Sequence, residues 1–175
     1  MTDMQTTSSS SAALAAFDRA RSAFQQSVED VPEAALQYRP EGEDYALGGL
    51  AVHVAQVLEK YARVLAVMRT STSGPVSEPE GLVEPDQDKA LIHDGYGNAQ
   101  RAQVVRRVAA AHAQVTEAIR ALPTASFDTK VPVIFAGSTE PYPASPADIL
   151  GWVHAHYDEH IAQIADLRKR WETVR

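Results

Sequence analysis

The sequence predicts an all-α fold, a four-helix bundle with long connections between its helices. Four segments place apolar residues three and four positions apart, the spacing that lines one face of a helix, and stretches containing Pro or Gly separate them. The 175 residues, 45% of them hydrophobic, are enough for one compact domain with its own core. We therefore expect a single bundle domain over residues 12–175, whose ligand sites would be built in the core from facing helices.

The N-terminal part of the chain predicts a tail followed by two long helices. Residues 1–11 are polar and rich in Ser and Thr, and we expect them to form a disordered tail. The first helix is expected over residues 12–29, where apolar side chains recur at helical spacing and a proline follows soon after. The second helix is expected over residues 46–69, which carry a long apolar stripe, with Asp44 as a candidate N-cap.

The C-terminal half predicts two more helices. Residues 97–122 are rich in alanine, carry valine and isoleucine on one side, and end before a proline. The fourth helix is expected to begin at Ser145 and to continue to about Trp171. Ser145 supplies a capping hydroxyl, Pro146 takes the first helical position, and Asp148 is an acid at the third.

Two of the connections are informative. Residues 70–96, between the second and third predicted helices, are rich in Pro, Gly and acids. A loop of this length is usually mobile or functional, so it could close over a site or act only as a linker. Residues 127–143, before the fourth helix, contain β-branched and aromatic residues around a Gly-Ser turn, which predicts an extended excursion or a short hairpin.

Composition excludes several classes of function. The formal net charge of -7 argues against nucleic acid as the main partner, because phosphate binding relies on clustered Lys and Arg. Without cysteine, any metal site must use nitrogen and oxygen ligands, and a cysteine nucleophile is excluded. The first residues do not resemble a signal peptide, and no segment approaches the length and hydrophobicity of a membrane span, so we expect a cytoplasmic protein.

Two histidines of the fourth predicted helix lie where apolar side chains are expected. His156 and His160 are four residues apart, so their side chains stack on one face, roughly 6 Å apart along the axis. Both fall inside the apolar stripe of the helix, whereas His154 falls well off it. Each could be a core histidine satisfied by one hydrogen bond. Alternatively, a divalent cation would satisfy both imidazoles, with a third ligand from a neighbouring helix.

Periodicity leaves two candidates for that third ligand. His53 lies at the edge of the apolar stripe of the second predicted helix, and His112 lies on the apolar line of the third. Both could face the core, and spacing alone does not choose between them. His93 lies in the acidic connection, where a solvated side chain is expected.

Two histidine-containing motifs follow one another along the chain, GLAVHVAQVLEKYARVL at residues 49–65 and HYDEHIAQI at residues 156–164. In their order and spacing, and in the number of helices, the chain resembles the DinB/YfiT-like family of four-helix bundles regarded as metal-dependent enzymes. The resemblance covers about residues 12–172. One departure is Tyr45, because an aromatic residue that is usually Trp often precedes the second helix in that family.

The resemblance implies a metal centre and a class of chemistry. The matching positions are His53, His156 and His160, which would bind a divalent ion, zinc or nickel, and leave coordination positions open. Open positions are typical of catalytic rather than structural zinc sites. Since the family includes thiol S-transferases and a mycothiol-dependent isomerase, the ion would activate either a low-molecular-weight thiol or water against a small substrate. Members of the family are often homodimers.

Two further residues of the fourth helix are candidates for the site. Gln163 lies close to the histidine face and is expected to orient a ligand imidazole by a hydrogen bond. Glu159 is the candidate catalytic residue, as a general base, although exposed acids on helices usually only interact with solvent.

Two alternatives to an enzyme remain open from the sequence. The protein could be a non-catalytic metal-binding or stress-related binding protein whose site is closed by a fourth side chain, with His112 as the obvious candidate. The three histidines could also hydrogen-bond one another without any metal.

Overall fold

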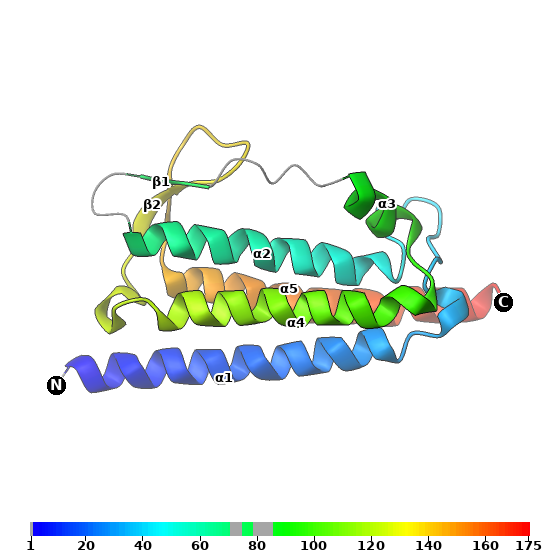
Figure 1. Ribbon diagram of the computed structural model, residues 1–175, viewed down its shortest axis with the longest axis horizontal. Coiled ribbons are helices and arrows are strands. Elements are labelled where there is room, and N and C mark those ends of the chain that lie inside the picture. Colours follow the sequence, from blue (N-terminus) through cyan, green and yellow to red (C-terminus); the bar gives the residue numbers. More distant parts are fainter. Residues whose placement is uncertain (1, 71–74, 79–85) are drawn as a thin grey trace.

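The computed structural model describes residues 2–70, 75–78 and 86–175, and it is mostly helical with one small sheet (Figure 1). Four long helices pack in a ring in which α1 and α2 each contact both α4 and α5. α1 and α5 run in one direction, and α2 and α4 run in the other (Figure 1). These helices are α1 (Thr2–Glu29), α2 (Gly49–Thr70), α4 (Asn98–Arg120) and α5 (Pro146–Thr173).

The start of α1 differs from the sequence prediction. The helix begins at Thr2, so residues 2–11, which were expected to be a disordered tail, continue the helix predicted from residue 12. No Gly or Pro occurs before Pro32, and Ser and Thr lower helix propensity without breaking a helix. Because adding a residue to an existing helix is much easier than nucleating one, the packed turns around Phe17 can extend toward the N-terminus.

The start of α2 is determined by close backbone packing. The predicted N-cap, Asp44, is wrong, because α2 begins at Gly49. A Cβ atom on Gly49 would lie 2.0 Å from the carbonyl oxygen of Ile92, which itself accepts a hydrogen bond from the Ala46 N–H at 2.9 Å. The chain before α2 is therefore held against the end of α3, one turn before His53.

The acidic connection contains two elements that were not predicted, β1 (Val76–Ser77) and α3 (Asp86–Asp94), while residues 71–74 and 79–85 lie outside the described part. α3 is held by tertiary contacts. Arg107 of α4 donates to both carboxylate oxygens of Asp88 and to both of Glu59 on α2, at 2.9–3.0 Å. The predicted closure of this connection over a site concerns residues outside the described part.

The connection before α5 forms the predicted hairpin. β2 (Val131–Ile134) and β3 (Tyr142–Ala144) pair antiparallel, and β1 adds a parallel strand to β2. The expected all-α fold thus gains a three-stranded sheet in the order β1-β2-β3. The predicted cap of α5 is confirmed, since the Asp148 N–H donates to Ser145 Oγ at 3.1 Å and Pro146 is the first helical residue.

The core is built from the facing sides of the four long helices. Two short 3-10 turns, η1 (Glu33–Ala35) and η2 (Thr124–Ser126), follow α1 and α4. Its fully buried large side chains include Phe17, Phe24, Leu50, Leu58, Leu65, Ile149, Tyr157 and Leu167. None of the helices in the described part is both long and apolar enough to cross a membrane.

Candidate metal centre

Three histidines from two helices meet at one point between α2 and α5. His53 comes from the second turn of α2, and His156 and His160 come from successive turns of α5. One potential ligand atom from each lies within 4.8 Å of the other two. The ring centroids are 5.1 Å apart for both pairs that include His53, and 4.3 Å apart for His156 and His160.

Two of the ring nitrogens in this group are buried without a partner. Nε2 of His156 and Nε2 of His160 make no hydrogen bond among the described residues, although both atoms are shielded from solvent. A buried polar atom left unpaired costs roughly 1–3 kcal/mol. His156 is therefore poorly explained as a core histidine satisfied by a hydrogen bond, which was one interpretation of the sequence, and Nε2 of His160 stays unpaired even though its Nδ1 contacts Gln163.

Gln163 determines which nitrogen of His160 can bind a ligand. Its Oε1 lies 2.8 Å from Nδ1 of His160. Because an amide oxygen only accepts, Nδ1 carries the proton and donates, which leaves the lone pair on Nε2. Gln163, the residue predicted to orient a ligand imidazole, is thus in contact with His160, and it leaves Nε2 of His160 with a free lone pair.

The imidazoles are held in the neutral form that a metal requires. Burial, with a smaller contribution from neighbouring imidazoles, lowers the pKa of His53 to about 4 and that of His156 to about 3. Burial also lowers the pKa of His160.

The distances between the rings are close to those of a metal site. Nitrogen ligands about 2.0–2.1 Å from one ion in tetrahedral geometry are roughly 3.3 Å apart, whereas the candidate ligand atoms lie within 4.8 Å of one another. A small inward movement of these side chains would therefore suffice to bind an ion.

These pKa shifts predict that the metal-free protein loses stability as the pH falls from 6.5 toward 4. In this pH range the unfolded chain binds protons at histidines that stay neutral in the folded protein. The free energy of unfolding is therefore highest above pH 6.5 and decreases as the pH falls toward the folded-state pKa values of His53 and His156. Urea unfolding of chelator-treated protein at several pH values measures the effect. His156→Gln should reduce the slope. Equal slopes in wild type and His156→Gln would contradict the prediction.

Two other side chains lie beside the cluster. The ring of Tyr45 packs 4.7 Å from the ring of His53 and 6.2 Å from that of His160. Glu159, the candidate general base, has a side chain that is 73% exposed, with Oε2 3.9 Å from Nδ1 of His156. Tyr45 thus packs against two of the three clustered histidine rings, whereas Glu159 makes only a long contact with His156.

The remaining histidines lie outside the cluster. His112 is buried, with Nε2 2.8 Å from the Asp18 carboxylate and Nδ1 3.3 Å from the Tyr157 hydroxyl. Since a carboxylate only accepts, Nε2–H donates to Asp18 and Nδ1 accepts from Tyr157. His93 lies on α3 rather than in a loop, but its side chain is exposed as expected, and His154 is also partly exposed.

A cavity of about 280 Å³ opens directly from the histidine cluster. It is lined by His53, Val57, Lys60, Tyr61, Trp152 and His156. The sequence patterns pointed only to the histidines of this lining, although the spacing of the other residues along the two helices also carried a signal. Val57, Lys60 and Tyr61 follow His53 at four, seven and eight residues, and Trp152 precedes His156 by four, so each set shares one helix face.

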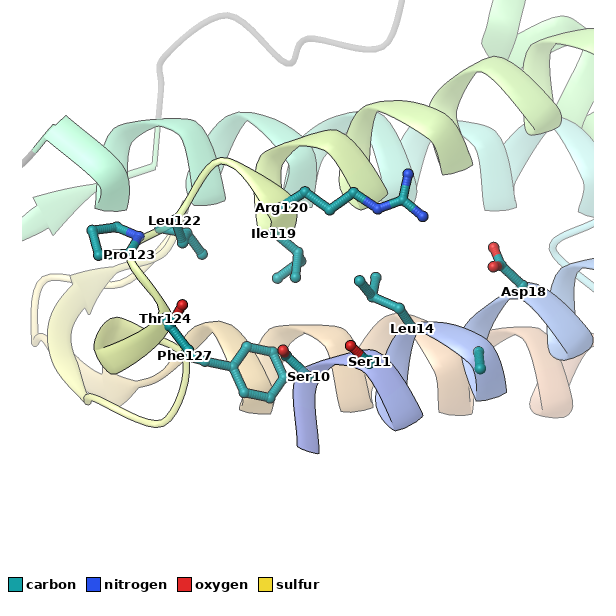
Figure 2. A pocket seen from close by; sticks show the side chains of 11 residues that line it. Ser10, Ser11, Leu14, Asp18, Ile119, Arg120, Leu122, Pro123, Thr124 and Phe127 are labelled. Atoms are coloured by element: carbon teal, nitrogen blue, oxygen red, sulfur yellow. The ribbon is translucent and has the colours of Figure 1, made fainter. Parts of the chain in front are cut away.

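A larger cavity of about 400 Å³ lies between α1 and the end of α4 and does not include the histidine cluster. In Figure 2, Leu14 of α1 and Ile119 of α4 point toward each other across it, with Phe127 on one side. Asp18, the partner of His112, lies at its edge.

Comparison with known proteins identifies the family of the chain. A comparison with curated proteins found no match. The model of the DinB superfamily matches residues 16–164, a stretch that contains all three clustered histidines and most of the four long helices. The resemblance inferred from the two histidine motifs is therefore confirmed, and the chain belongs to the DinB superfamily.

Proposed function

We propose that this protein is a metal-dependent enzyme, built on the four-helix bundle of its family, that acts on a small substrate at a centre formed by His53, His156 and His160. The observation that carries the proposal is the pair of buried, unpartnered Nε2 atoms of His156 and His160 in a cluster of three neutral imidazoles. A divalent ion, zinc or nickel, is the ligand that satisfies such nitrogens together.

The hydrogen bonds of His112 support an open coordination position at the ion. Among the described residues, the group that could hold a metal has three members. His112, the candidate fourth ligand of a closed site, is hydrogen-bonded to Asp18 and Tyr157 instead. Three protein ligands beside a cavity favour a catalytic centre over a structural one.

The bound ion would supply Lewis acidity, which favours the deprotonated form of a low-molecular-weight thiol or of water. The chain's own residues supply the geometry. Gln163 fixes the tautomer of His160, and Tyr45 packs against His53 and His160. The cavity beside His53 and His156 gives a small substrate access to the centre. We include Glu159 as a proton acceptor, supported only by its contact with His156.

Replacing Gln163 with leucine is expected to weaken Zn²⁺ binding about 10–100-fold, because His160 loses the acceptor that fixes its tautomer and orientation. Gln163→Glu keeps an acceptor at this position and should retain most of the affinity. Competition with a chromogenic chelator measures both variants. Equal affinity in wild type and Gln163→Leu would mean that Gln163 does not orient the ligand.

Activity assays test the reaction class. Metal-loaded protein is incubated with several cellular thiols and a generic electrophile, and in parallel with ester and amide substrates. Thiol-dependent turnover that His53→Ala abolishes would support an S-transferase, and hydrolysis without thiol would support a hydrolase. Full metal occupancy with neither activity would favour the alternative of a non-catalytic or stress-related metal-binding protein.

Three further expectations belong to this proposal: a cytoplasmic location, a homodimer, and a small-molecule substrate rather than nucleic acid. The net charge of -7 supports the last of these. Light scattering tests the dimer.

A further inference from the structure

The cavity beside the histidine cluster has an aromatic end. The rings of Tyr61, Phe135 and Tyr142 lie 6.0–6.1 Å from the ring of Trp152. Phe135 and Tyr142 come from the β2–β3 hairpin, which places them against the α2 and α5 residues that line the cavity. Tyr142 is 54% exposed, which is unusual for an aromatic side chain in this molecule. The ring pairs are tilted or edge-on, and an aromatic cluster of this kind favours a planar apolar group.

The same cavity is lined by a lysine, Lys60. The Lys60 side chain lines it and is 31% exposed, with Nζ 3.3 Å from Oε2 of Glu78. Glu78 is held in place because its Oε2 also accepts a hydrogen bond from the Ala136 N–H at 2.9 Å, and its side chain is only 3% exposed. The carboxylate is thus buried behind the cation, and the ammonium has two further N–H groups to offer.

Tyr61 adds a neutral donor to this end of the cavity. Burial, and the nearby Glu78 carboxylate to a smaller extent, raise the pKa of Tyr61 above its ordinary value. Its hydroxyl therefore stays protonated at neutral pH and can donate to an anion. None of the described lining residues is an Asp or a Glu, so the lining itself adds no negative charge.

We infer that the small substrate of this centre is a carboxylate with a planar apolar group, in which the carboxylate pairs with Lys60 and the planar group packs on Trp152. The inference rests on the proposed function, because it assigns a substrate class to the same site. Lys60 and Trp152 then determine specificity and not metal binding, since neither belongs to the histidine cluster.

Benzoate and its uncharged counterpart benzamide are suitable probes, and binding is measured on chelator-treated protein so that no metal is needed. The chain has two tryptophans, so in a Trp171→Phe background the fluorescence reports on Trp152 alone. We expect saturable quenching by benzoate and weaker quenching by benzamide. Lys60→Met should weaken benzoate binding about fivefold, as for a partly exposed ion pair, and should leave benzamide binding unchanged.

Matched variants separate charge from folding. Lys169→Met removes an exposed lysine near the end of α5 and should change neither affinity. Glu78→Gln removes the carboxylate that competes for Lys60 and should strengthen benzoate binding about threefold. Ligand NMR with Trp152→Leu should show weaker binding of both probes, and circular dichroism checks that each variant is folded.

The outcomes distinguish this inference from the proposed function. Equal binding of benzoate and benzamide, equal effects of Lys60→Met and Lys169→Met, or no saturable binding of either probe would overturn the substrate class. Any of these results leaves Zn²⁺ binding by the histidines intact. Conversely, if the protein binds benzoate selectively but binds no metal, the carboxylate subsite at Lys60 and Trp152 stands and the proposed metal-dependent function fails.

Discussion

His160→Ala is expected to lower the affinity for Zn²⁺ on the order of 1000-fold, because it removes one of three nitrogen ligands and leaves only two to coordinate the ion. His160 is the most buried of the three histidines, and its Nε2 makes no hydrogen bond in the described structure. Competition titration and elemental analysis of protein purified without an affinity tag measure the change.

The matched control is His154→Ala. His154 belongs to the same helix, but its side chain is 36% exposed and contacts Asp158, outside the cluster. It should keep wild-type affinity. Similar losses in both variants, or equal trace metal in wild type and His160→Ala, would mean that the histidine cluster does not bind the ion.

Gly49→Ala is expected to cost at least about 3 kcal/mol of unfolding free energy, since the new methyl group overlaps backbone atoms of Ile92 and not the end of a flexible side chain. Its Cβ would lie 2.0 Å from the carbonyl oxygen of Ile92. That oxygen accepts the Ala46 N–H, so relief of the overlap separates α3 from the start of α2. Because His53 lies one turn further along α2, Zn²⁺ affinity should fall as well.

Gly151→Ala provides the control for Gly49→Ala. Gly151 is exposed on α5, and a Cβ atom there would have nothing within 4 Å. Alanine has the higher helix propensity, so this variant should gain up to about 1 kcal/mol. Urea unfolding measures both variants, and a neutral Gly49→Ala would show that the start of α2 is not packed as described.

The long helices could be predicted because their signals are local. The cap of α5 depends on Ser145, Pro146 and Asp148, which are neighbours in sequence, and it is found as expected. β1 and α3 could not be predicted in this way. β1 has two residues and exists through its parallel pairing with β2, and α3 is fixed by the contacts of Asp88 with Arg107 and Gln56.

The histidine face of α5 was predictable, but the third ligand was not. α5 presents His156 and His160 to α2 and, on an adjacent face, presents Tyr157 to α1 and α4, where it contacts His112. Both His53 and His112 therefore face α5. The choice between them depends on a rotation of about 100° around one helix, the angle of a single residue, and apolar periodicity does not resolve it. The family resemblance indicated His53, and the structure brings it to the cluster.

Anomalous diffraction from crystals of the metal-loaded protein tests the central claim most directly. We expect one anomalous peak between α2 and α5, about 2.0–2.1 Å from a nitrogen of each of His53, His156 and His160, with at least one coordination position not filled by the protein. A peak away from these three residues would contradict the metal centre. A fourth protein ligand at the ion would contradict an open, catalytic site.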